Sequence, residues 1–196
     1  MKNDRKPLLV HAVVLISCLG AQCTSAESTT QATPVGNTLT ATARLGLTVV
    51  IPRFLSFRIG NRANTIDTLT FEPSPERVGD GSSVNATGGD AAGGGGTRVN
   101  LRSNAGQITI TTSNDDGVGG LGSRGAVSLT EISTQSDTPD LAAPALTDAG
   151  GSSSRATITR GNITDLAATW RYEYSNRHAV DSGTYRAEII YTAASP

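Results

Sequence analysis

Few side chains in this sequence could carry out covalent chemistry. An activated Ser, Thr or Cys needs a base within hydrogen-bonding reach, and the two histidines are His11, in an apolar N-terminal stretch, and His178, in the turn-rich residues 175–183. The Gly-x-Ser-x-Gly pattern, which presents a nucleophilic serine on a sharp turn, does not occur. We therefore predict no catalytic residues, interpret His178 as an exposed loop histidine, and expect this chain not to be an enzyme.

Motifs for metals and nucleotides are also weak. The aspartates of the presumed loops lack the alternating spacing with which one loop encloses Ca²⁺; they are Asp90, Asp115, Asp116, Asp137 and Asp140. Gly117-x-Gly119-x-x-Gly122 matches the dinucleotide fingerprint, but that motif requires a strand followed by a helix. Here Ala126–Ile132 alternates like a strand, so we predict a glycine-rich hairpin loop, no metal and no cofactor.

One local motif is informative about architecture. Asp181-Ser182-Gly183-Thr184-Tyr185 resembles the tyrosine corner of immunoglobulin-like domains, in which the tyrosine hydroxyl bonds back to the main chain. Trp170 and Tyr172, on the preceding predicted strand, are then expected in the core. A sugar-stacking platform at Trp170 is the alternative, and it would make carbohydrate a possible partner.

The sequence predicts that these residues are carried by β-strands. Residues 38–50 alternate apolar and polar side chains, and Leu55, Phe57 and Ile59 continue the pattern after Pro52. Seven further strands are predicted at Thr65–Phe71, Thr97–Arg102, Gly106–Thr112, Ala126–Ile132, Arg155–Thr159, Thr169–Tyr174 and Thr184–Ala193. No window keeps a helical period of 3.6 residues over three turns. We predict an all-β, antiparallel, immunoglobulin-like sandwich whose long Gly-rich loops lie at residues 72–96, 113–125 and 134–154.

The N-terminus has the features of an export signal. Lys2, Arg5 and Lys6 precede an apolar stretch over residues 7–19, and residues 24–26 end in the small residues that signal peptidase accepts. The stretch is shorter than the about 20 residues that span a bilayer. We predict a signal peptide at residues 1–26, a flexible arm at 27–37 and one domain at 38–196. The protein is expected to be exported, to the cell surface, the periplasm or the medium.

A second processing route stays open, because Leu15-Ile16-Ser17-Cys18 resembles a bacterial lipobox and Cys18 could anchor a lipid. Cleavage after Ala26 would instead remove both cysteines and both lysines. It would take away three of the 16 basic residues and one of the 17 acidic ones, which leaves a net charge of −3. This mild acidity, with no basic run, argues against nucleic acid or an anionic membrane as a partner.

The two ends of the chain, Thr38–Val50 and Ser182–Tyr191, resemble those of chaperone–usher pilus subunits, most closely the cysteine-free alternate branch. The resemblance implies a subunit that lacks one strand and accepts the N-terminal segment of another subunit by β-augmentation. Its partners would be other copies or related subunits, a periplasmic chaperone and an outer-membrane usher. Tyr185, Ile189 and Tyr191 would border the acceptor groove. The implied donor-strand side chains are Leu39, Ala41, Ala43, Leu45, Leu47 and Val49.

A different reading of the same segment is also possible. Residues 38–50 could be an internal strand of a self-complete sandwich, secreted or lipid-anchored, that binds a carbohydrate or an envelope protein. The two hypotheses differ in one structural expectation. The fibre subunit requires an unpaired sheet edge and a free segment, whereas the self-complete binding module requires that segment to be paired inside its own domain.

Overall fold

The computed structural model describes residues 28–32, 36, 38–61, 65–114, 119–122 and 125–196. The chain divides between Val50 and Ile51 into two units. In the first unit, residues 38–50 have neither helix nor strand and are all exposed. Their alternating pattern favours a strand, but a strand also needs a hydrogen-bonding partner, and none of the described strands pairs with them.

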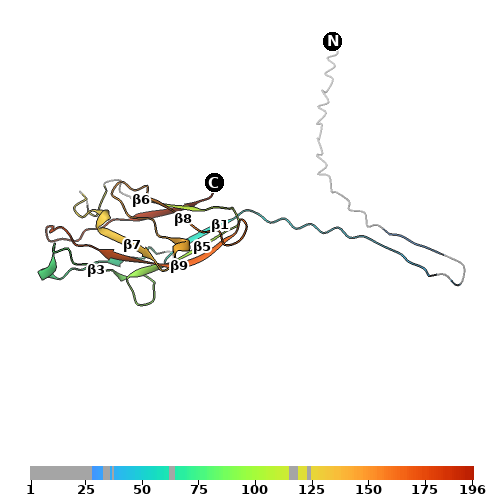
Figure 1. Cartoon of the computed structure of the whole chain (residues 1–196), viewed down its shortest axis with the longest axis horizontal. Helices are drawn as coiled ribbons and strands as arrows, with labels where there is room; N and C mark the ends of the chain where they lie inside the picture. Colours follow the sequence, from blue (N-terminus) through green and yellow to red (C-terminus); the bar gives the residue numbers. More distant parts are fainter. Residues whose placement is uncertain (1–27, 33–35, 37, 62–64, 115–118, 123–124) are drawn as a thin grey trace, which may run out of the picture. The chain divides into compact units, whose positions relative to one another are not determined.

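The second unit contains two main antiparallel sheets (Figure 1). The first has the order β1-β5-β9-β3, and β7 also pairs with β9. Its strands are β1 (Leu55–Ile59), β3 (Val84–Asn85), β5 (Gly96–Ser103), β7 (Ile132–Ser136) and β9 (Thr164–Tyr174). The second sheet has the order β10-β6-β8, from β6 (Thr109–Asn114), β8 (Ser153–Arg155) and β10 (Ile189–Ala194). A short ribbon pairs β2 (Leu69–Thr70) with β4 (Thr87–Gly88). The prediction of an all-β, antiparallel protein is therefore confirmed.

The alternation of each long strand determines which side chains enter the core. In β9 the residues Ala168, Trp170, Tyr172 and Tyr174 are buried, and the residues between them are exposed or half-buried. Val99 and Leu101 of β5 and Ile108 and Ile110 in and beside β6 are fully buried in the same hydrophobic cluster. Full burial of one such aliphatic side chain stabilises the fold by about 1.5–3 kcal/mol. Both sheets therefore depend on one shared core.

Four of the predicted strands after residue 60 differ from the structure. Arg155–Thr159 overlaps β8 only at Arg155. Thr65–Phe71 is reduced to the two-residue β2, and Thr184–Ala193 becomes regular only from Ile189, because the Tyr185 turn occupies its first part. Ala126–Ile132 contains the single-turn 3₁₀ helix η2 (Leu129–Glu131). The Ser128 side chain accepts a hydrogen bond from the Thr130 N–H, and Asp148 accepts one from the Leu129 N–H, so side chains stabilise this turn in place of a ladder.

The predicted loops contain more regular structure than expected. Residues 72–96 include β3, β4 and the 3₁₀ helix η1 (Pro75–Arg77), and residues 134–154 include most of β7 and η3 (Pro139–Leu141). Glycine is needed where the backbone of this region packs closely. Gly89 has a φ of +72°, and a Cβ there would collide with the carbonyl oxygen of Gly96. In the part of the chain that the structure describes, no helix is long and apolar enough to cross a bilayer.

Candidate interaction site

The exposed segment of the first unit carries all six predicted donor side chains. Residues 38–50 are named here the donor segment. Leu45, Leu47 and Val49 are 83–85% exposed, and Leu39 is 54% exposed. Ala41 and Ala43 are exposed as well. A row of uncovered Leu and Val side chains is costly in water, so the donor segment has the composition of a surface that binds another apolar surface.

The C-terminal strand β10 has one paired and one unpaired edge. It pairs with β6 along its whole length, and no other described strand pairs with it. Along β10 and the residues before it, one side-chain row faces the core but is only half-buried, and the other is exposed. The half-buried row comprises Tyr185, Ala187, Ile189, Tyr191 and Ala193. The three predicted groove-border residues thus share one face, beside an edge with which no described strand pairs.

Strand β1 has a second unpaired edge. It pairs with β5, and among the described strands it has no other neighbour. Its core-facing Phe57 and Ile59 are half-buried, and Leu55 is 38% exposed. Arg53, just before β1, donates a hydrogen bond from Nη2 to Ser195 Oγ, just after β10, over 3.5 Å. β1 and β10 therefore belong to different sheets, approach each other at this end and border the same core. Their unpaired edges are named here the open edges.

Aromatic side chains form the floor beside the β10 edge. The rings of Tyr191 and Trp170 lie 5.4 Å apart between centroids, and the Tyr191 and Tyr172 hydroxyl groups are 3.2 Å apart. Burial raises the pKa of the Tyr191 hydroxyl, and the adjacent Tyr172 raises it further. Burial also raises the pKa of Tyr172. Both hydroxyl groups are neutral at physiological pH, so this floor carries no charge.

The predicted tyrosine turn is present. The Tyr185 hydroxyl donates a hydrogen bond to the main-chain oxygen of Asp181 over 2.6 Å. The ring lies against Gly122, where a Cβ would come within 2.8 Å of Tyr185 Cδ1. This turn delivers the chain to β10 and sets the phase of its half-buried row.

The aromatic-platform hypothesis at Trp170 is wrong. Its indole is fully buried, and Nε1 donates to the Leu141 main-chain oxygen over 2.9 Å. A sugar ring can stack only on an exposed aromatic face. Trp170 and Tyr172 belong to the core, as the alternation along their strand predicted.

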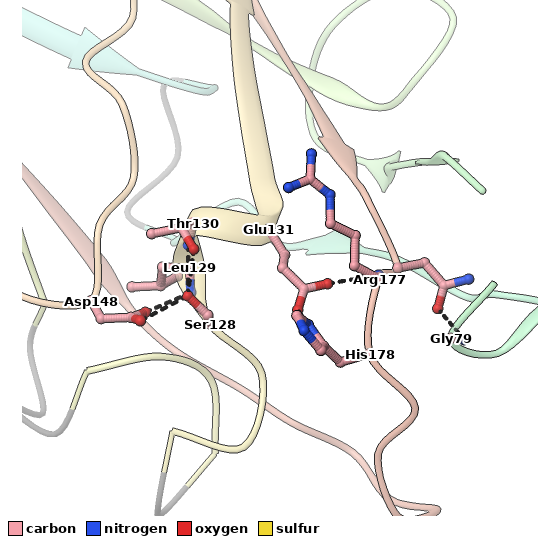
Figure 2. A network of polar contacts seen from close by, with 9 residues as sticks. Gly79, Ser128, Leu129, Thr130, Glu131, Asp148, Arg177 and His178 are labelled. Atoms are coloured by element: carbon pink, nitrogen blue, oxygen red, sulfur yellow. Dashed lines mark hydrogen bonds and ion pairs between the residues drawn. The ribbon is translucent and has the colours of Figure 1, made fainter. Parts of the chain in front are cut away.

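Figure 2 shows a polar network that the sequence did not reveal. The carboxylate of Glu131, a buried residue, accepts hydrogen bonds from the Arg177 main-chain N–H over 2.9 Å and contacts His178 Nδ1 at 2.6 Å. The His178 side chain is 75% exposed, in agreement with its interpretation as an exposed loop histidine. Nothing in the local pattern marks Glu131, because its partners lie 46 and 47 residues away.

The same loop is fixed on its other side by Asn176, a residue with a φ of +47°. Its Nδ2 donates to the Arg77 carbonyl oxygen over 2.6 Å, and its Oδ1 accepts from the Gly79 N–H over 3.0 Å. Residues 175–178 are therefore bound to Glu131 through Arg177 and to Arg77 and Gly79 through Asn176. This arrangement stabilises a loop; its contacts do not present an activated nucleophile.

The remaining predicted motifs have no site geometry among the described residues. Gly119 and Gly122 adopt positive φ angles, and the chain that follows enters η2 and β7, so the helix required by a dinucleotide fingerprint does not follow them. Gly117, Asp115 and Asp116 lie outside the described residues. Within the described ranges, no group of three His, Cys, Asp or Glu side chains is placed to hold a metal ion.

Comparisons with known proteins bring no assignment to this arrangement. No protein-family model matches the chain, and neither curated proteins nor solved structures give a match.

Proposed function

We propose that this protein is an exported structural subunit of a surface fibre, with an immunoglobulin-like sandwich that is completed by the donor segment of another copy. In this proposal the donor segment adds a strand between the open edges. Main-chain hydrogen bonds supply affinity, and alternate Leu and Val side chains of the segment enter the partly covered core. A periplasmic chaperone would occupy the same position before assembly, and an outer-membrane usher would order the subunits.

One observation carries the proposal. The chain has an exposed segment with alternating apolar side chains, and β1 and β10 each have one edge with which no described strand pairs, beside a partly covered core. An internal strand of a self-complete domain would bury Leu45 and Leu47 and would pair with a neighbour. The lack of a strand at residues 38–50 therefore favours the fibre subunit over the self-complete binding module.

The proposal is tested by changing the two faces of the donor segment separately. The first variant, Leu45→Asn with Leu47→Asn, removes two side chains that would enter the neighbouring core. The matched control, Thr40→Asn with Thr48→Asn, changes two exposed residues on the opposite face. Fibres are detected by sedimentation and electron microscopy after expression with the cognate chaperone and usher. We expect fibres to be lost in the first variant and kept in the control; equal assembly by both chains would refute the proposal.

A further inference from the structure

Asn104, the first residue after β5, binds the chain just before β1. Its Oδ1 accepts a hydrogen bond from the Phe54 N–H over 2.8 Å, and its Nδ2 donates to the Pro52 carbonyl oxygen over 2.8 Å. The Asn104 main-chain N–H also donates to the Phe54 carbonyl oxygen over 3.3 Å. The side-chain amide thus acts as an additional peptide group and continues the pairing of β1 with β5 beyond Leu55.

Two neighbours strengthen this contact. The hydroxyl group of Ser103, a fully buried residue, donates to the Phe54 carbonyl oxygen over 2.9 Å and accepts from the Ala105 N–H over 3.0 Å. Arg53 Nη2 donates to the Ala105 carbonyl oxygen over 3.4 Å. We name the bonds from Ser103 and Asn104 to Pro52 and Phe54 the Asn104 clamp. Residues 52 and 54 both face β5, as alternate residues of a strand do.

The clamp constrains where the donor segment can go. Residues 51–54 are the whole connection between the donor segment and β1. For the segment to pair with the β1 edge of its own chain, these four residues would have to form a hairpin turn. The central residues of such a turn leave the extended conformation, so the backbone groups of Pro52 and Phe54 could not keep their bonds to Asn104.

We infer that Asn104 is a positioning residue that keeps the donor segment from pairing with the β1 edge of its own chain, so that this edge accepts the donor segment of a second copy. This inference rests on the proposed function, because it concerns the same segment and the same open edges. The partner it selects is another molecule of this chain. The side-chain amide of Asn104 does this by keeping residues 51–54 in a strand-like conformation.

The test uses the full chain and a fluorescent synthetic peptide with the sequence of residues 38–50. Peptide binding is measured by anisotropy at concentrations at which light scattering shows monomers. A chain with Leu45→Asn, Leu47→Asn and Val49→Asn has a donor segment that cannot insert, so it reports on the open edges alone. If this chain fails to bind the peptide, the proposed function fails.

The clamp is then tested in chains with the natural donor segment. The unaltered chain should bind the peptide, because the clamp keeps its own segment from turning back onto the β1 edge. Asn104→Ala should weaken peptide binding at least tenfold, because the chain's own segment now competes from within the molecule. The chain that carries Asn104→Ala together with the three Asn substitutions in the donor segment should bind the peptide as well as the triple variant does. That result would show that Asn104→Ala leaves the open edges intact. Asn100→Ala, the same change at a residue within β5, should bind like the unaltered chain.

Equal binding by the unaltered and Asn104→Ala chains would overturn the inference while leaving the proposed function in place. So would an unaltered chain that fails to bind while the triple variant binds. Circular dichroism establishes that each variant is folded. Should Asn104→Ala not fold, a Gly-Asn-Gly-Ser insertion after Ile51 gives the segment room to turn upstream of an intact clamp. The same tenfold loss is then expected, and undiminished binding by the insertion chain would equally refute the inference.

Discussion

Replacing Glu131 by alanine should lower the free energy of unfolding by about 1.5–4 kcal/mol. Its carboxylate accepts a 2.9 Å hydrogen bond from the Arg177 main-chain N–H, and hydrogen bonds to charged groups contribute about 1.5–3 kcal/mol. The His178 contact adds no more than about 1 kcal/mol, since that imidazole is 75% exposed and solvent screens the pair. For a domain of this size the loss corresponds to a fall in Tm of roughly 5–15 °C.

The assay is urea denaturation followed by the fluorescence of Trp170, the single tryptophan of the chain. Glu188→Ala is the matched control, because Glu188 is exposed and its removal should change stability by less than about 0.5 kcal/mol. His178→Ala should cost at most about 1 kcal/mol. If Glu131→Ala costs no more than Glu188→Ala, then the network in Figure 2 does not stabilise the loop and the reasoning is wrong.

Three further outcomes are expected. Trp170→Phe removes the indole hydrogen bond to a buried main-chain oxygen and some packing volume, and should cost about 1–3 kcal/mol in a denaturant titration. Tyr185→Phe loses one hydroxyl bond to the main chain and should cost about 0.5–1.5 kcal/mol; a neutral effect would show that the turn does not need this bond. Burial raises the pKa of both Tyr172 and Tyr191 in the folded state, whereas an unfolded tyrosine ionises near about pH 10. Their stabilisation is thus complete below about pH 10 and is lost as the pH rises above it; denaturant midpoints between pH 8 and 12 should show this decline, and Tyr191→Phe should make it shallower.

Period-two patterns predicted much of the fold because strand faces are a local property. The alternation from Ala168 to Tyr174 identified which side chains of β9 are buried. The tyrosine turn was also predictable, since Tyr185 and its acceptor are four residues apart. Prediction from local patterns failed where side-chain hydrogen bonds replace the backbone hydrogen bonds between strands. Ser128 and Asp148 stabilise a 3₁₀ turn at Leu129 in a stretch that alternates like a strand.

Local residue patterns suffice to predict the all-β class, the inward faces of the long strands and the apolar alternation of residues 38–50. The tertiary structure is needed to show which strands pair, and therefore that the β1 and β10 edges are unpaired among the described strands. It also decided the surroundings of Glu131 and Asn104, whose partners lie 46 to 52 residues away. The physical reason is that alternation specifies which way a side chain points, whereas pairing and burial depend on contacts between segments far apart in the chain.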